Sequence, residues 1–344
     1  MCGARPRRLS RFFDRQVECL RKWEGILIPQ VNKVTADRLH KVKLHRSMNA
    51  GLAVKTIIEN CLRQIQDNKR AMQLRDNPEH IRQMHISLRR LMSALGLFKD
   101  IAPLPAKLQV DLRSLSTKLG VARNWRVLSC SSLTKIEALA PDELRVSALR
   151  QIALDITNKE ENLVYDAVSK NGFSRLMSAL LHWLEKVQLS GSENSQTKWK
   201  WDKKIPRVAK RILLDQQWHL IKIGDHLLKQ GKNSNPLERH KFRIAVKRLR
   251  YLCMFFQEFF PKKEMNKYLA SLSALQENLG ISNDAAVADR LLCDLIQDSR
   301  DQVASGNFVR GYLLSHLVLH QHNLRPLWKY HQDVKFPNLK TKHD

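Results

Sequence analysis

The sequence contains few of the residues that interrupt helices and few of those that favour strands. There are 12 glycines and 11 prolines in 344 residues, and aromatic residues make up 7% of the chain. A composition of this kind favours helices over strands and over disorder. The sequence therefore predicts an all-α fold.

Cysteine is also scarce, and the cysteines are far apart. No two of them form a C-x-x-C pair, which argues against a structural zinc site and against a disulfide framework, and which fits a reducing compartment. The six cysteines are Cys2, Cys19, Cys61, Cys130, Cys253 and Cys293.

Acidic residues are outnumbered by basic ones almost two to one. The chain has 60 Lys and Arg against 33 Asp and Glu, which gives a net charge of +27 and a pI near 10.1. Such a protein should seek a polyanion: nucleic acid, polyphosphate or an anionic membrane surface. Charge alone does not choose among these partners.

Long apolar runs are missing, so the sequence predicts no membrane span. The N-terminus, M-C-G-A-R-P-R-R-L-S-R-F-F-D-R, lacks the apolar core of a secretory signal. Its arginines suit an organellar transit peptide, whereas Asp14, Glu18 and Glu24 oppose one. We expect a cytoplasmic protein. An association with granules of polyphosphate, one of the polyanions named above, is left open, as is an organellar or nuclear location.

The sequence contains none of the common motifs that carry catalysis. The sequence shows no P-loop and no nucleophile elbow. His316 and His320 lie at i and i+4 but without the Glu of H-E-x-x-H, so we interpret the pair as incidental. The sequence predicts no catalytic residue, no metal site and no cofactor.

The most informative stretch runs from Leu237 to Phe260 and has two contrasting faces when drawn as a helix. Like charges along one face oppose helix formation, and mixed signs are the usual arrangement. One face of this stretch is basic and contains no Asp or Glu, so it lacks the stabilisation that neighbouring side chains of opposite charge give to a helix. Its members are His240, Arg243, Lys247 and Arg250, and the apolar face holds Phe242, Ala245, Val246, Leu249, Leu252, Cys253 and Phe256.

A similar pattern occurs earlier, from Arg82 to Phe98. A shift of 158 residues superposes Arg82 on His240, His85 on Arg243, Arg89 on Lys247 and Arg90 on Arg248. With two extra residues the register continues, and Thr117 to Leu128 resembles Glu277 to Ala288. The chain thus has the pattern of a duplicated unit.

These residues carry a family resemblance. The second stretch, H-x-x-R-x-x-x-K-x-L-R-Y followed by L-x-x-L-Q-x-x-L-G-x-x-N-D-A-x-x-A, closely resembles the CHAD family, the conserved histidine α-helical domain. The first, P-E-x-x-x-Q-M-x-x-x-L-R-R-L-x-S-A-L, is similar to that family's first-half signature. The resemblance covers residues 46–335. It implies two pseudo-symmetric four-helix bundles with a basic central furrow or pore that binds inorganic polyphosphate.

The sequence departs from the family pattern at three places. The usual order of His and then Arg is reversed at Arg82 and His85, which keeps both positions cationic or ionisable. The first-half loop reads Arg-Asn-Trp-Arg over 123–126 in place of R-D-x-D, which puts helix capping by those acids in doubt. Met92 replaces a commonly basic position, so the first basic helix should contribute less charge than the second.

The resemblance and the periodicity together predict the organisation of the chain. We expect an N-terminal basic extension over 1–45, a first bundle over 46–188, a linker over 189–205, a second bundle over 206–335 and a frayed basic tail over 336–344. The predicted helices are 51–68, 78–98, 106–120, 142–168, 172–188, 206–230, 237–260, 263–279, 284–305 and 308–323.

The function predicted from the sequence is non-catalytic binding of inorganic polyphosphate by two facing basic helices. His85 and His240 would donate hydrogen bonds to phosphate. The predicted binding residues are Arg82, His85, Arg89, Arg90, Arg207, Lys210, Arg211, His240, Arg243, Lys247, Arg248 and Arg250.

Two alternatives remain open. A nucleic-acid-binding protein fits the charge, and Trp199, Lys200, Trp201 and Lys203 mix aromatics with cations as single-strand binders do. No helix-turn-helix, zinc finger or RNA-binding signature supports it, so any such binding would be non-specific. A polyphosphate or triphosphate hydrolase would need carboxylates to hold Mg²⁺, and the basic faces contain none.

Overall fold

The fold is described from a computed structural model, which places residues 41–74, 77, 79–193, 202–230, 235–297 and 300–340. Over these ranges the secondary structure is helical, apart from one isolated bridge between Asn49 and Lys204. The predicted all-α class is confirmed. None of the helices described is both long and apolar enough to cross a bilayer.

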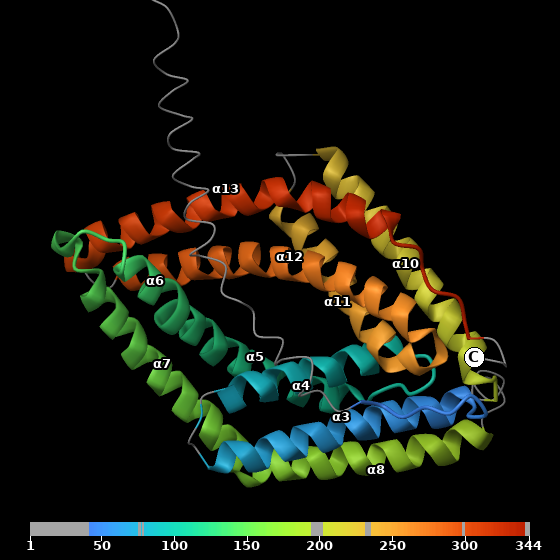
Figure 1. Cartoon of the computed structure of the whole chain (residues 1–344). Coiled ribbons are helices and arrows are strands. Elements are labelled where there is room, and N and C mark those ends of the chain that lie inside the picture. Colours follow the sequence, from blue (N-terminus) through green and yellow to red (C-terminus); the bar gives the residue numbers. More distant parts are fainter. Residues whose placement is uncertain are drawn as a thin grey trace, which may run out of the picture. The chain divides into compact units, whose positions relative to one another are not determined.

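The helices follow in two series (Figure 1). The first comprises α3 (Ala50–Gln73), α4 (Glu79–Leu97), α5 (Ala106–Val127), the π-turn η1 (Leu128–Ser132), α6 (Leu133–Glu137), η2 (Asp142–Leu144), α7 (Val146–Ser169) and α8 (Asn171–Glu193). The second comprises α10 (Ile205–Gln230), α11 (Pro236–Phe256), η4 (Gln257–Phe259), α12 (Lys262–Gln297), η5 (Arg300–Gln302) and α13 (Val303–Asp333).

Local sequence explains where the key helices begin. The Asn49 side chain accepts a hydrogen bond from the Leu52 amide at 2.8 Å and caps α3. Asn235 does the same for Leu237 at 2.9 Å, and Pro236 occupies the first turn of α11. Both basic stretches predicted from sequence are helices, α4 and α11.

Several predicted helix boundaries were wrong. The last helix, α13, runs over Val303–Asp333 where 308–323 was predicted. The predicted helices 263–279 and 284–305 are largely one helix, α12, which runs through Gly280. Likewise α5 continues past Val127 through a π-turn into α6. A glycine inside a helix costs about 1 kcal/mol, which the buried leucines along α12 outweigh. The expected loop at 123–126 is therefore helical, and no capping acids are needed there.

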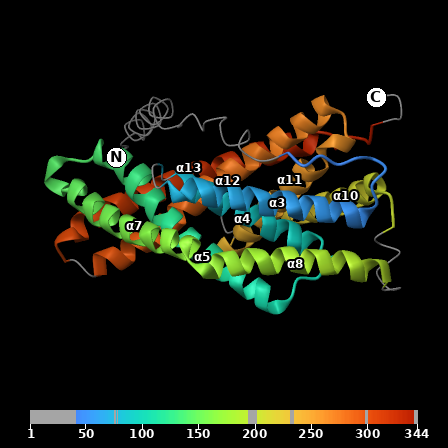
Figure 2. The same cartoon turned by 90° about the horizontal axis from the view of Figure 1, so that it is seen from below.

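The packing order of the first series repeats in the second. Helix α4 packs between α3 and α5, and α5 packs on α7; in the same way α11 packs between α10 and α12, and α12 packs on α13. The series meet where α4 contacts α11 and α5 contacts α12. Figures 1 and 2 both show α8 alongside α3. This repeated order supports two related bundles, whose pseudo-symmetry stays a prediction.

The C-terminal part of α11 is buried on all sides, as its sequence predicts. Phe255 and Phe256 are fully buried, and Tyr251 is 8% exposed. The ring of Phe256 meets that of Phe98 from α4 edge-on at 6.1 Å. The basic face of α11 therefore runs directly into the core shared by the two series.

Both ends of the described chain pack more closely than predicted. Val42 and Leu44, assigned to the extension, are buried. In the predicted tail, Phe336 contacts the rings of Phe260 and Tyr268, and the Lys340 amide donates to the Phe259 carbonyl at 3.0 Å. The expectation of a frayed tail was thus wrong for residues 336–340. The predicted linker also begins inside α8, which continues to Glu193.

Candidate anion-binding site

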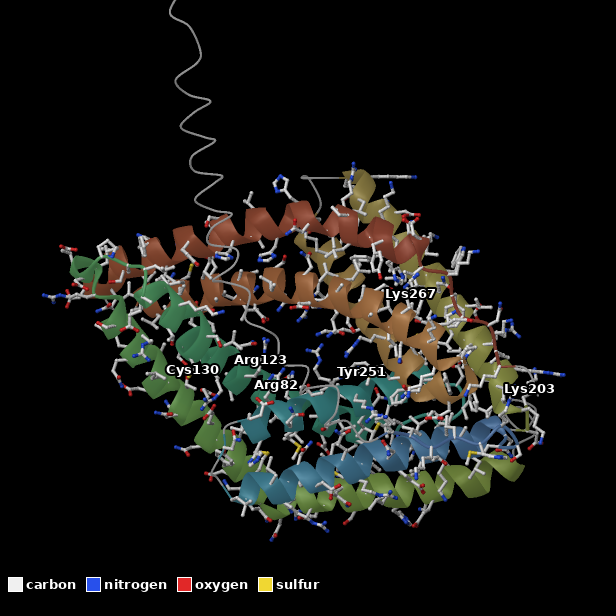
Figure 3. The ribbon with its side chains drawn as sticks, viewed as in Figure 1. Arg82, Arg123, Cys130, Lys203, Tyr251 and Lys267 are labelled. Carbon is white, nitrogen blue, oxygen red and sulfur yellow. The ribbon has the colours of Figure 1, made fainter. Side chains whose placement is uncertain are left out.

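Cationic side chains from both series gather where α4 and α5 meet α11 and α12. We call this set the central cluster. Figure 3 shows Arg123 near the middle of the molecule, between the two series. The central cluster consists of His85 and Arg89 from α4, Arg123 from α5, His240, Arg243 and Lys247 from α11, and Asp284 from α12.

His85 lies deep within the central cluster. Burial is the largest cause that lowers its pKa to about 3, and the positive charges of Arg89, Arg123, Lys247 and Arg243 contribute in the same direction. A Cβ at Gly120 of α5 would lie 3.7 Å from the ring, so α5 closes this side. Among the residues described, His85 Nδ1 is buried with no hydrogen-bond partner. The imidazole is therefore held neutral in the absence of an anion.

Lys247 and Arg243 are also partly buried among positive charges, which disfavour their protonated forms. Burial and the neighbouring guanidinium groups lower the pKa of Lys247 to about 6, and burial with Arg89 and Arg123 lowers that of Arg243 to about 10. Arg243 Nε is buried and has no partner among the described residues. A cluster that depresses its own pKa values in this way is short of negative charge.

The negative charge in the cluster comes from Asp284. Its carboxylate accepts two hydrogen bonds from Arg123, Nη1 to Oδ1 at 2.8 Å and Nη2 to Oδ2 at 2.7 Å. This bidentate pair joins α5 to α12 and is about a quarter exposed on each side. Asp284 also raises the pKa values of Arg243 and Lys247, against the larger effects of burial.

Sequence reasoning missed the Arg123–Asp284 pair. A signal was present: the superposition of Thr117–Leu128 on Glu277–Ala288 aligns Arg123 with Asn283 and Asn124 with Asp284. In this alignment the cationic Arg123 of one segment is therefore one position away from the anionic Asp284 of the other. The expected loop at 123–126 and the expected break between helices 263–279 and 284–305 hid the fact that both segments lie within continuous helices.

Four predicted binding residues on α4 and α11 have other surroundings. Arg82 pairs with Glu79 at 2.7 Å, and Arg250 donates to Ser273 and Gln276 of α12 at 3.1 and 3.3 Å. Arg90 is 1% exposed, donates to Gln64 at 2.9 Å and lies over the Phe255 ring. Arg248 is half-buried, with no described contact to the central cluster. The structure brings His85, Arg89, His240, Arg243 and Lys247 together and places these four outside.

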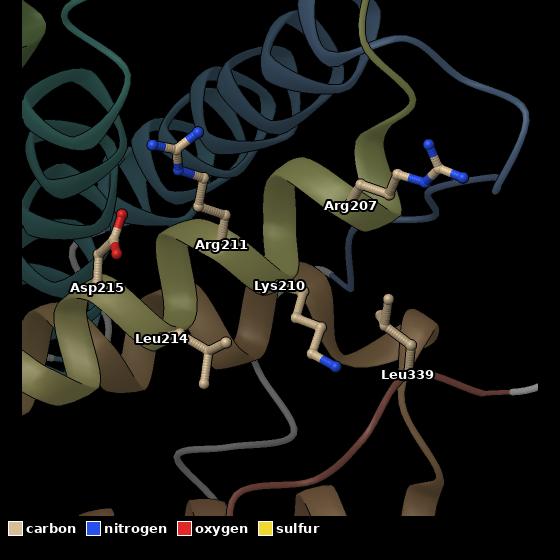
Figure 4. Close-up of a pocket in the computed structure, with 6 residues that line it drawn as sticks. All are labelled: Arg207, Lys210, Arg211, Leu214, Asp215 and Leu339. Atoms are coloured by element: carbon tan, nitrogen blue, oxygen red, sulfur yellow. The ribbon is translucent and has the colours of Figure 1, made fainter.

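The remaining predicted residues, Arg207, Lys210 and Arg211, line a separate pocket of about 320 Å³. Leu214 and Asp215 of α10 and Leu339 of the C-terminal segment complete it (Figure 4). None of its lining residues belongs to the central cluster. In Figure 4 the three cationic side chains leave the helix in different directions, which suits an extended anion better than one phosphate.

Other candidate features carry no further chemistry in the structure. Within the described ranges, no three His, Cys, Asp or Glu side chains are grouped as a metal site. His316 bonds to the Tyr312 hydroxyl at 2.9 Å and stacks on His320. The predicted stacking segment at 199–201 lies outside the described residues.

Comparisons with known proteins agree with this fold. The model of the CHAD domain matches residues 56–293. The crystal structure of the CHAD domain from the plant Ricinus communis aligns with a TM-score of 0.77 and 30% identity, over 88% of this chain and 98% of that one. PptA from Streptomyces chartreusis shares the fold, with a TM-score of 0.58 and 12% identity over 82% of this chain and 99% of that one. Comparison with curated proteins gives no match. With a family model covering more than half of its length, the chain belongs to the CHAD domain family.

Proposed function

We propose that this protein binds inorganic polyphosphate at the central cluster and does not hydrolyse it. The observation that carries the proposal is the convergence of Arg89, Arg123, Arg243 and Lys247 from three helices of both series around one carboxylate. That carboxylate, Asp284, is already held by Arg123. The cluster therefore has an excess of positive charge, which an anionic ligand would neutralise.

The arrangement suits a linear anion with charge on every unit. His240, Arg243 and Lys247 follow each other at three- and four-residue spacing over about 10 Å of helix axis. Arg89 of α4 belongs to the same electrostatic group, so a ligand lying along α11 would also be contacted from α4. Arginine can hold phosphate oxygens bidentately, and lysine supplies a compact charge.

Ligand binding at this site would be coupled to proton uptake. Free Lys247 has its pKa lowered to about 6 and His85 to about 3, because both are buried among cations. A phosphate chain would neutralise the neighbours and raise both pKa values. Lys247 would then be protonated at neutral pH only when the ligand is present, and binding would grow stronger as the pH falls.

Family membership supports the proposal, because the resemblance noted in the sequence implies a polyphosphate ligand. Nucleic acid is a weaker fit to the central cluster, since its members supply charge and hydrogen-bond donors and include no Phe, Tyr or Trp side chain for stacking. Metal-assisted hydrolysis would require carboxylates that are free to hold Mg²⁺. The carboxylate of Asp284 is committed to Arg123.

Isothermal titration with long-chain polyphosphate tests the proposal. We expect the Arg243→Ala/Lys247→Ala variant to lose about 100-fold or more in affinity with an unchanged helical circular dichroism signal, since charged hydrogen bonds contribute about 1.5–3 kcal/mol each. The Arg248→Ala variant is the matched control on the same helix. Equal affinity of the double variant and the control would refute binding at this site.

Catalysis is tested separately. Incubation of the wild-type protein with polyphosphate and Mg²⁺ should release no more phosphate than the buffer alone. Release that disappears in the Arg243→Ala/Lys247→Ala variant would show that the cluster is a hydrolytic site.

A further inference from the structure

The outer face of α10 carries a second group of cations, accompanied by exposed apolar side chains. We call this face the α10 stripe: Arg207, Arg211, Leu214, Trp218 and Lys222. These positions recur at three- and four-residue spacing and therefore share one side of the helix. All five are exposed, and the opposite side holds buried core residues such as Leu213 and Leu220.

Trp218 is the most unusual member of the α10 stripe. Its side chain is 65% exposed, and Leu214, one turn earlier, is 42% exposed. Lys222 Nζ lies 5.5 Å from the centre of the Trp218 rings. Single exposed apolar residues are ordinary, but a tryptophan beside a leucine within a row of cations forms a surface that can bind both rings and charge.

The cations of this face are not neutralised within the described structure. Arg207, Lys210 and Arg211 make no hydrogen bond or ion pair with any described residue, not even with Asp215, which shares their pocket. Asp225, further along the same side, accepts hydrogen bonds from Trp328 at 3.0 Å and Gln332 at 2.9 Å. The α10 stripe therefore presents positive charge that is available to a ligand.

We infer that the α10 stripe binds single-stranded nucleic acid, with a base stacked on Trp218 and the phosphates on the flanking cations. Aromatic side chains within a positive groove are the general means of holding single strands without reading sequence. An inorganic phosphate chain has no ring or apolar part to cover Trp218 and Leu214. The stacked base would take the place of Lys222 on the ring, and Lys222 would move to a phosphate.

The length of the α10 stripe selects a strand over a single nucleotide. Arg207 and Lys222 are 15 residues apart, which corresponds to about 22 Å of helix axis. A stacked strand rises about 3.4 Å per nucleotide, so roughly six nucleotides span the stripe. In a duplex the bases are stacked internally and are not available to Trp218, so duplex DNA should not depend on this residue.

This inference does not depend on polyphosphate binding at the central cluster, because the two sites share no residue. The experiment uses the full chain carrying Arg243→Ala/Lys247→Ala, which removes the central contribution. Fluorescence anisotropy of a labelled 12-nucleotide oligo-dT is then measured at physiological salt. Adding Trp218→Ala should weaken binding about 5- to 100-fold, and Trp218→Phe should restore most of it.

The controls separate stacking from charge and from folding. Tyr330→Ala removes an aromatic residue that is 47% exposed on α13 and should leave oligo-dT affinity unchanged. Arg207→Ala/Arg211→Ala should weaken binding and reduce its dependence on salt. The mononucleotide dTMP should bind far more weakly than the oligonucleotide.

Three results would overturn the inference. Unchanged oligo-dT affinity in Trp218→Ala would exclude stacking, and an equal loss in Tyr330→Ala would show that the effect is not local. Equal dependence of duplex binding on Trp218 would show a site that does not select single strands. Polyphosphate affinity of the Trp218→Ala variant with an intact central cluster should equal wild type, which keeps this test distinct from that of the proposed function.

Discussion

The basic residues of α4 and α11 align at four pairs of positions in sequence, yet the structure uses them differently. On α11, His240, Arg243 and Lys247 belong to the central cluster. On α4, the equivalents of the last two, His85 and Arg89, do so as well, whereas Arg82, the equivalent of His240, pairs with Glu79. The duplicated pattern thus determines which turns of each helix face the other series. The neighbouring residues determine which of the cationic side chains belong to the central cluster.

The fourth pair of equivalent positions shows the difference most clearly. Arg90 on α4 is 1% exposed and is held by Gln64, with the Phe255 ring beneath its guanidinium. Arg248 on α11 is only half-buried. Equivalent arginines therefore have a structural role on one helix and a peripheral position on the other.

The largest effect is expected from breaking this pair. Arg90→Ala should lower the free energy of unfolding by about 3 kcal/mol, because it removes a large buried side chain together with its hydrogen bond to Gln64. Arg248→Ala should change it by less than about 0.5 kcal/mol. Urea unfolding followed by circular dichroism measures both, and similar values for the two variants would contradict the assigned roles.

The second-largest effect is the change of polyphosphate affinity with pH. The pKa of Lys247 is lowered to about 6 in the free protein, and a bound phosphate chain would raise it toward its ordinary value of about 10.4. Between these values binding takes up a proton, so affinity should increase as the pH falls, by up to tenfold per pH unit. Titrations between pH 9 and 7.5 test this. A Lys247→Met variant should show a flatter profile, and parallel profiles would exclude Lys247 as the proton acceptor.

Much of this comparison could be predicted from sequence. The apolar period of the stretches around Leu88 and Leu249 identified both helices, and the shift of 158 residues identified the pairing of His85 with Arg243 and of Arg89 with Lys247. Periodicity defines one face of a helix, so it cannot tell a residue at the edge of that face from one in its centre. Arg90 and Arg250 lie at such edges, and their side chains turn into neighbouring helices.

Contacts between distant segments could not be predicted. The Arg123–Asp284 pair joins residues 161 positions apart. It exists because residues 123–126 are helical where a loop was expected, and because Asp284, predicted as the start of a helix, lies inside the continuous helix α12. The pocket beside Leu339 likewise depends on a C-terminal segment fixed by Phe336 and by the Lys340 amide. Helix periodicity carries no information about either contact.

A smaller effect should separate two arginines of α4 in ligand binding. Arg89→Ala should weaken polyphosphate binding about tenfold, because it removes one cation of the central cluster. The charge of Arg89 reaches across the interface between the series, where it lowers the pKa values of Lys247 and Arg243. Arg82→Ala should weaken it less than about threefold, since Glu79 already neutralises Arg82. Titration calorimetry at one salt concentration compares them, and a larger loss in Arg82→Ala would reverse the order of these two positions.

The smallest predicted effect is a gain in stability. Lys247→Met removes a buried amine whose protonated form is disfavoured by burial and by its cationic neighbours, and it should stabilise the ligand-free protein by about 1 kcal/mol. Because the folded-state pKa is lowered, the unfolded chain binds the extra proton, and the gain should be greatest near pH 6 and should vanish toward pH 10. Urea unfolding at several pH values measures it. Destabilisation at pH 6 would show that the charge of Lys247 is compensated in the free protein.

A crystal structure of the chain with tripolyphosphate tests the central claim most directly. We predict one ligand whose phosphate oxygens lie within hydrogen-bond distance of Arg89 on α4 and of Lys247 on α11 at the same time. A ligand bound only on the outer face of α10, with the central cluster unchanged, would contradict the claim.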